Sequence, residues 1–162
     1  MKRLLPLIAI MLLFVSCGKS DLDKANELIA QKGLNVEAAT SLDSLNSYSD
    51  CLEMRIKAAK ITHEADSTLA AGIESAEQMK ANEQTDVLPG FAKRLQEDVV
   101  AMYRVAYKYT QDANFNQFQH SLAKDPIEFL GYQCKVSNDS LSYIVAFDPE
   151  ITKILMVEKV RK

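Results

Sequence analysis

The chain has 162 residues, a formal net charge of −3 and charged side chains at 25% of its positions. This length fits one globular domain once an N-terminal targeting segment is set aside. Lysine and arginine are scattered among acidic residues instead of forming a basic stretch, so the charge pattern argues against nucleic acid as a partner.

The chain begins with the layout of a secretion signal. Lys2 and Arg3 supply a basic start, and residues 4–15 are apolar and interrupted only by Pro6. An apolar run of about a dozen residues is too short for a helix across a bilayer, which needs about 20. We therefore expect residues 1–16 to be a signal peptide that is removed.

This segment ends in the letters LLFVSC, with the small residue Ser16 directly before Cys17. The ending resembles the lipobox of bacterial lipoproteins. The resemblance implies that the Cys17 thiol carries a diacylglycerol, that the chain is cut before it, and that an acyl chain such as palmitate modifies the new amino group. Two or three acyl chains hold a protein firmly, since each buried methylene contributes about 0.8 kcal/mol and one chain binds only reversibly. The alternative is an ordinary secretion signal in which Cys17 has no special role.

The rest of the chain divides into a tether and one domain. Residues 17–23 are polar and predict a lipidated tether, and residues 24–162 predict a single α+β domain. Within the domain we expect helices over 24–124 and a β-meander over 128–159, because the apolar period changes from 3.6 to two between them.

A short helix is expected first. Asp21 can cap a helix that runs to Lys32, and Gly33 is placed to end it. Residues 34–47 mix polar and apolar side chains and predict a connection with about one helical turn.

Two long helices are expected next. Residues 49–82 contain no proline and many good helix formers, residues 82–90 break the pattern with Pro89 and Gly90, and a second helix runs from Phe91 to about residue 122. Each helix has an apolar stripe at steps of three and four, so we expect an antiparallel helical hairpin. The first stripe is rich in small residues, which allow close approach: Met54, Ala58, Ile61, Ala65, Leu69, Gly72, Ala76 and Met79. The second contains Phe91, Leu95, Val99, Met102, Ala106 and Tyr109.

Three strands are expected after Asp125-Pro126. Apolar residues alternate with polar ones over 132–136 and 141–147, and a third β-rich run covers 153–158. Turn residues separate the runs, so the strands predict an antiparallel meander. One apolar face of such a sheet needs a cover, and the amphipathic helices are available to supply it.

Two segments add a family resemblance. Residues 20–29 read SDLDKANELI, and residues 129–132 read FLGY ahead of the expected hairpin. With the lipobox and the long helices, they resemble a group of uncharacterised Bacteroidota lipoproteins, in which a DKAN-like opening precedes long helices and an F-[IL]-G-[WY] segment enters strands. The resemblance implies an architecture and an envelope location, and it supplies neither an activity nor catalytic residues.

The residues after Cys17 bear on location. Gly18 is not the aspartate that marks inner-membrane retention in other bacteria, so the outer membrane is expected. Asp21 and Asp23, separated by Leu22, resemble part of a surface-export signal. Periplasmic and surface-facing placements both stay open.

The sequence predicts no catalytic site, metal site or cofactor. It contains no G-x-S-x-G elbow, phosphate-binding glycine loop, H-E-x-x-H pair or C-x-x-C motif. His63 and Asp66 share a helix face, but catalytic zinc needs three protein ligands, so a solvated surface is the favoured interpretation. His120 lies near a helix end, where an imidazolium would interact favourably with the helix dipole.

Cys51 and Cys134 are the remaining thiols. An oxidising envelope compartment would allow a disulfide between them. Two buried free thiols are the alternative, because free cysteine is among the most buried residue types.

Tyr103 and Tyr107 lie one helical turn apart. If they are exposed, they suit an interaction surface, since tyrosine is enriched at interfaces. If they are buried, they cover the sheet, and this interpretation is favoured because large aromatic side chains contribute strongly to small cores.

Two functional hypotheses follow. The preferred one is a membrane-anchored envelope lipoprotein that binds another envelope protein or helps an assembly, without catalysis. The alternative is a small hydrolase or ligand-binding domain whose site is built from residues distant in sequence.

Overall fold

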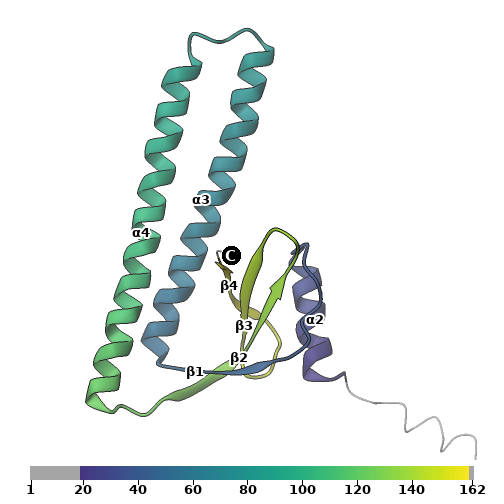
Figure 1. Cartoon of the computed structure of the whole chain (residues 1–162), viewed down its shortest axis with the longest axis vertical. Helices are drawn as coiled ribbons and strands as arrows, with labels where there is room; N and C mark the ends of the chain where they lie inside the picture. The colour runs from purple at the N-terminus through teal and green to yellow at the C-terminus, as the bar shows by residue number, and fades with distance from the viewer. Residues whose placement is uncertain (1–18, 161–162) are drawn as a thin grey trace, which may run out of the picture.

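The computed structural model describes residues 19–160 and shows three helices and four antiparallel strands (Figure 1). The predicted α+β class is confirmed. The predicted signal peptide and Cys17 lie outside the described residues. Within residues 19–160, no helix has the length and apolar character needed to cross a membrane.

The four strands form one sheet in the order β1-β2-β3-β4, with every pair antiparallel. The predicted meander corresponds to β2, β3 and β4, so the prediction of three strands was one short. The strand bounds are β1 Asp43–Ser47, β2 Glu128–Ser137, β3 Ser142–Phe147 and β4 Ile154–Val160.

Strand β1 replaces the connection with a helical turn expected within residues 34–47. It has five residues and only one buried side chain, that of Leu45, so its alternation is too short to recognise. Its hydrogen-bond partner is β2, far along the chain, where Ser47 pairs with Glu128. The strand therefore depends on tertiary pairing rather than on a local pattern.

Helix α2 (Asp21–Gln31) covers one face of the sheet. Its N-cap is Ser20 rather than the predicted Asp21: the Ser20 hydroxyl accepts a hydrogen bond from the Asp23 backbone, and the Asp23 carboxylate accepts one from the Ser20 backbone. This reciprocal pair is a capping box. The core beneath α2 consists of Ala25, Ile29, Ala39, Cys134, Val136, Val145, Phe147 and Ile151.

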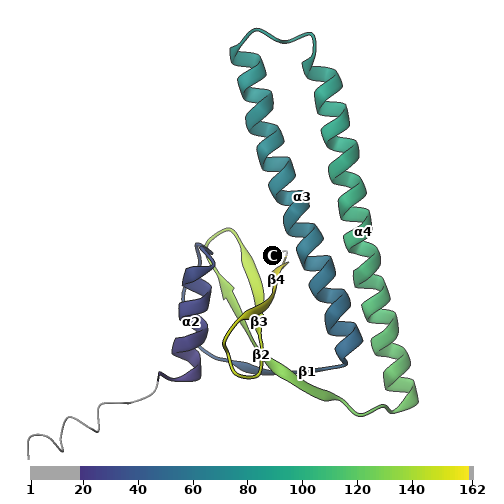
Figure 2. The same ribbon diagram turned by 180° about the vertical axis from the view of Figure 1, so that it is seen from behind.

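Helix α3 (Ser49–Ala81) covers the opposite face with its first turns. Leu52 packs with Ala146 of β3 and Met156 of β4, and Ile56 adds to the same cluster. The sheet therefore lies between α2 on one side and α3 on the other (Figure 2). This arrangement confirms that helices cover the sheet.

Helices α3 and α4 (Leu88–Ala123) form the predicted antiparallel hairpin, which projects well beyond the sheet (Figure 1). Pro89 and Gly90, expected in the loop, lie in the first turn of α4, where proline is tolerated because the first backbone N–H groups have no helical partner. Small buried residues recur every seven positions at the interface. They are Ala58, Ala65 and Gly72 on α3, facing Val99, Ala106 and Ala113 on α4.

Candidate functional site

Polar side chains converge where α3 begins and α4 ends. Asp50 and Cys51 lie in the first turn of α3, and His120 lies in the last turn of α4. His120 Nε2 is 3.1 Å from Asp50 Oδ1, and its Nδ1 is 2.6 Å from Asp125 Oδ2 just beyond the helix. The Tyr48 ring stacks on the imidazole, with centroids 4.3 Å apart. The antiparallel hairpin thus brings both of its ends into one polar cluster, which we call the hairpin base.

The charged side chains of the hairpin base stabilise one another's charged forms. Hydrogen bonds to Asp125 and Asp50 raise the pKa of His120 above its ordinary value. Burial raises the pKa of the Asp50 carboxyl, but hydrogen bonds from His120, Asn116 and the Cys51 backbone outweigh burial, and the net pKa is lowered. Relative to isolated groups, both pKa shifts favour the ion-paired form, an imidazolium beside a carboxylate.

The hairpin base also contains three ligand types in one place. One oxygen of Asp50, the sulfur of Cys51 and one ring nitrogen of His120 all lie within 4.8 Å of one another. Sequence reasoning placed His120 at a helix end and missed its partners. Asp50 and His120 are far apart in the chain, and only the register of the folded hairpin brings them together. The local sequence contains no signal of that register.

The possible disulfide between Cys51 and Cys134 is not formed. Both are free, buried thiols within the described part of the chain. Cys134 belongs to the core under α2, whereas Cys51 belongs to the hairpin base, so the sheet face separates their environments. Burial raises the pKa of Cys134 to about 11.

Tyr103 and Tyr107 do not cover the sheet, so the favoured interpretation of this pair was wrong. Tyr103 is half-buried and faces α3, where its hydroxyl hydrogen-bonds the Asp66 carboxylate. Tyr107 is 65% exposed. Only Tyr107 therefore belongs to an exposed surface.

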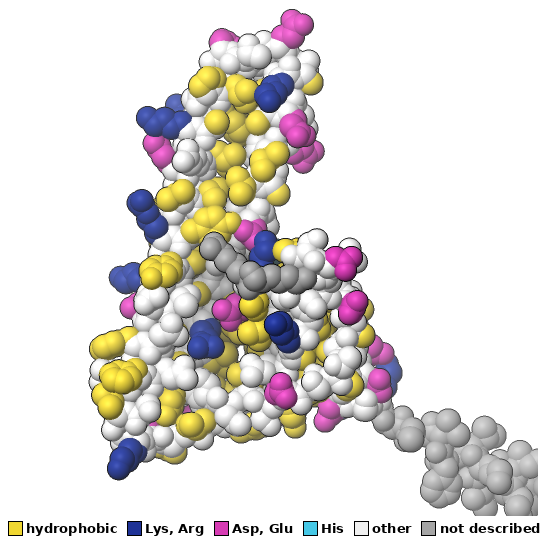
Figure 3. All heavy atoms as spheres, in the orientation of Figure 1, with side chains coloured by type: hydrophobic (Ala, Val, Ile, Leu, Met, Phe, Trp, Pro, Cys, Tyr) yellow, Lys and Arg dark blue, Asp and Glu magenta, His cyan; other side chains and the backbone are white. Residues whose placement is uncertain are grey.

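Tyr107 is part of an apolar stripe on the outer face of α4. Successive residues turn by about 100°, so the stripe residues lie within a sector about 80° wide, on the side away from the buried interface with α3. Their exposure ranges from 38% to 65%. Figure 3 shows hydrophobic side chains exposed over the lower part of α4. We call this surface the outer stripe: Val100, Tyr107, Phe115, Phe118 and Leu122.

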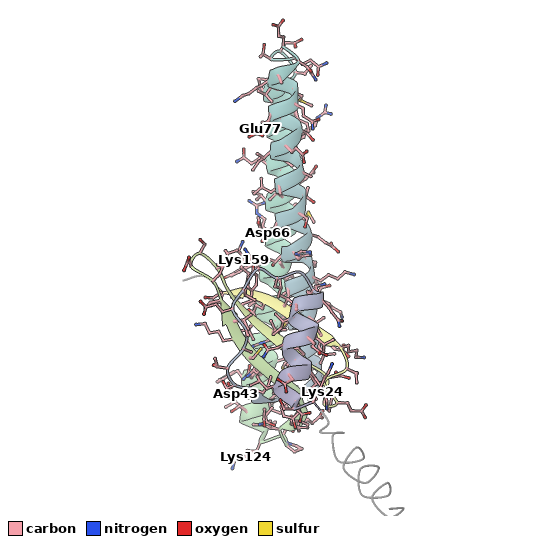
Figure 4. All side chains as sticks on the ribbon, turned by 90° about the vertical axis from the view of Figure 1, so that its right-hand side faces the viewer. Lys24, Asp43, Asp66, Glu77, Lys124 and Lys159 are labelled. Carbon is pink, nitrogen blue, oxygen red and sulfur yellow. The ribbon has the colours of Figure 1, made fainter. Side chains whose placement is uncertain are left out.

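A groove of about 500 Å³ lies between α3 and β4, with His63 on its rim. Two acidic side chains, Glu64 and Asp66, line the groove. Asp66 is held by Lys159 Nζ at 3.3 Å (Figure 4) and by the Tyr103 hydroxyl. His63 is exposed and forms no hydrogen bond or ion pair with another described residue. His63 and Asp66 therefore form no hydrogen bond with each other.

Comparisons of this chain with protein-family models, with curated proteins and with solved structures found no match.

Proposed function

We propose that this protein is a lipoprotein held at the outer membrane by lipidated Cys17, and that its outer stripe docks an amphipathic helix of another envelope protein. In this proposal it is a non-catalytic assembly module. The observation that carries the proposal is the outer stripe itself. An apolar face on the side of α4 away from α3 is the kind of exposed patch that marks interaction sites.

The shape of the stripe favours a helix as its occupant. From Val100 to Leu122 the stripe runs about 33 Å along α4, at a rise of 1.5 Å per residue. A partner helix laid alongside α4 would present apolar residues at steps of three and four to this length. A flat membrane surface would contact only one end of the stripe, because the hairpin projects from the rest of the molecule (Figure 1).

The charges beside the stripe favour an acidic partner. Arg104 lies within the sector of the outer stripe and Lys108 borders it, and neither forms an ion pair with another described residue. Glu97 lies on this face one turn before Val100, and its carboxylate is 4.0 Å from Lys93 Nζ. We therefore infer that acidic side chains flank the apolar face of the partner helix.

The position of the proposed anchor predicts how the molecule is oriented on the membrane. Two residues separate Cys17 from Ser20, so the three steps between them reach at most about 11 Å. Lys24 of α2 and Lys124 beyond α4 lie at one end of the molecule, with Glu77 toward the other end (Figure 4). A chain anchored at Cys17 would therefore hold the hairpin base toward the membrane and extend the tip away from it.

The groove beside His63 gives weaker support to the alternative function, a hydrolase or ligand-binding domain. Catalysis needs a base or nucleophile aligned with a second polar group. Asp66 is already paired with Lys159 and Tyr103. Neither His63 nor Glu64, which also line the groove, forms a hydrogen bond or ion pair with another described residue. The groove therefore supplies no such alignment among its described residues.

Site-specific photo-crosslinking in intact cells tests the docking proposal. A photoreactive phenylalanine analogue is placed at Phe118 on the outer stripe, and in a matched strain at Ile73, which is also exposed but lies on α3. We expect an adduct with one protein from position 118 and none from position 73. Mass spectrometry should map the adduct to an amphipathic segment with acidic flanks.

Other adducts would contradict the proposal. An adduct of twice the chain's mass would identify a second copy as the occupant. A lipid adduct at position 118 would identify the membrane as the occupant. Equal adducts from positions 73 and 118 would show that the outer stripe has no special role.

A further inference from the structure

The hairpin base has the composition of a transition-metal site. Thiolate, imidazole and carboxylate are the ligands that zinc uses in proteins, whereas calcium and magnesium prefer oxygen alone. The three ligand atoms come from both ends of the hairpin and lie within 4.8 Å of one another. We propose that Asp50, Cys51 and His120 bind one Zn²⁺ ion, with water as the fourth ligand.

The three ligand atoms would have to move only slightly to bind one ion. Bonds of about 2.1 Å in a tetrahedral site place neighbouring ligand atoms about 3.4 Å apart. The separation of 3.1 Å between His120 Nε2 and Asp50 Oδ1 is already close to that value. The Cys51 sulfur lies within 4.8 Å of both other ligand atoms, so it has to move by at most about 1 Å, which a small rotation of its side chain supplies.

Hydrogen bonds with neighbouring side chains orient two of the three ligands, His120 and Asp50. A histidine that binds zinc usually donates its other ring N–H to a carboxylate, which fixes the orientation of the ring. Asp125 Oδ2 lies 2.6 Å from His120 Nδ1 and is placed for that role. Asn116 donates to Asp50 Oδ2 at 2.9 Å, which leaves Asp50 Oδ1 facing the imidazole. These contacts distinguish the cluster from an isolated surface acid or a lone cysteine.

The surroundings would restrict the geometry further. Tyr48 stacks on one face of the imidazole, and Cys51 is fully buried. Cys51 would bind as the thiolate, the form of cysteine that ligates metals. The ion would join the first turn of α3 to the last turn of α4 and close the hairpin at its base. This inference depends neither on the lipid anchor nor on the outer stripe.

Cobalt absorption tests the site without relying on a mutation. The full chain is extracted in detergent, stripped with a chelator and titrated with Co²⁺, which occupies zinc sites and gives a thiolate-to-metal charge-transfer band. We expect the band to saturate at one Co²⁺ per chain and to disappear when Zn²⁺ is added. Mg²⁺ should leave it unchanged.

Variants assign the ligands. Cys51→Ser should abolish the charge-transfer band, and Asp50→Asn or His120→Asn should weaken Co²⁺ binding more than tenfold. Asp125→Ala, which removes the acceptor of the His120 Nδ1–H hydrogen bond and leaves the three ligands in place, should weaken binding about 10- to 100-fold. His63→Asn, Cys134→Ser and Cys17→Ser are matched controls and should bind as the unmodified chain does.

The absence of a charge-transfer band from the unmodified chain at stoichiometric Co²⁺ would overturn the proposal. So would a band that survives Cys51→Ser, or binding that is lost in the His63→Asn control instead of in His120→Asn. Circular dichroism checks that each variant is folded. If Cys51→Ser fails to fold, Asp50→Asn decides, because the Asp50 side chain is 44% exposed and its amide has nearly the same shape.

Discussion

At position 131, the backbone conformation and a close main-chain contact both require glycine. The φ of Gly131 is +137°, and an added Cβ would lie 2.1 Å from the Phe147 carbonyl oxygen. This close approach occurs opposite Leu45, next to the register shift between β1 and β2. The FLGY segment, noted in the sequence for a family resemblance, thus has a local physical reason for its glycine.

We predict that Gly131→Ala lowers the free energy of unfolding by at least about 3 kcal/mol, because backbone strain and overlap with a main-chain oxygen add. The matched control is Gly33→Ala. Gly33 also has a positive φ, of +75°, but nothing lies within 4 Å of its added Cβ. The control should cost only about 1 kcal/mol, from the left-handed backbone alone. Urea denaturation of both variants measures the difference, and equal losses would contradict this account of Gly131.

Ser20 and Asp23 form the capping box of α2. Hydrogen bonds from the Ser20 hydroxyl and the Ser20 backbone lower the pKa of Asp23. A carboxyl with a lowered folded-state pKa stabilises the fold above its unfolded pKa, near 3.8, and loses that contribution as the pH falls through the folded value.

We predict that Ser20→Ala destabilises the protein by about 1 kcal/mol at pH 7, as typical N-cap replacements do. The gap between variant and unmodified chain should narrow below about pH 4, where Asp23 takes up its proton. Urea denaturation at pH 7 and at pH 3 tests both statements. A gap that widens toward pH 3 would show that Asp23 is not part of the cap.

At the scale of elements, close packing of α3 on α4 depends on small residues. Asp66 contacts Tyr103, and Asp50 contacts Asn116, so the register of the antiparallel hairpin places Ala65 near Ala106. Both alanines are buried. Larger side chains there would push the helices apart.

We predict that Ala65→Leu costs about 1 to 3 kcal/mol, the usual cost of overpacking a well-filled interface. Ala70→Leu, on the exposed side of the same helix, should change stability by less than about 0.5 kcal/mol. Both variants have similar helix propensity, so the difference reports packing alone. Chemical denaturation provides the comparison, and an unchanged stability in Ala65→Leu would show that the interface is loosely packed.

The elements also show what local sequence can and cannot predict. The long helices were predictable because Ala58, Ala65 and Gly72 recur at helical spacing without proline between them. Strand β1 was not, since its only buried residue is Leu45 and its pairing with β2 is set by the tertiary fold. The hairpin base was missed for the same reason: His120 meets Asp50 only in the register of the folded hairpin.

At the scale of the whole molecule, the outer stripe and the proposed anchor rest on different observations. Tyr103 and Tyr107 were predicted as one unit, but the orientation of α4 sends one residue toward α3 and exposes the other. The outer stripe could not be predicted from the sequence, because packing against α3 decides which side of α4 is exposed. The anchor, by contrast, was proposed from the signal segment alone.

Fractionation of cells is the most direct measurement of the central claim that Cys17 holds the protein at the membrane. We predict that the unmodified chain and the Phe118→Ser variant both sediment with membranes, whereas Cys17→Ser appears in the soluble fraction. Phe118 is 58% exposed, so its replacement should leave the fold intact. Membrane retention of Cys17→Ser, or release of Phe118→Ser, would contradict the account.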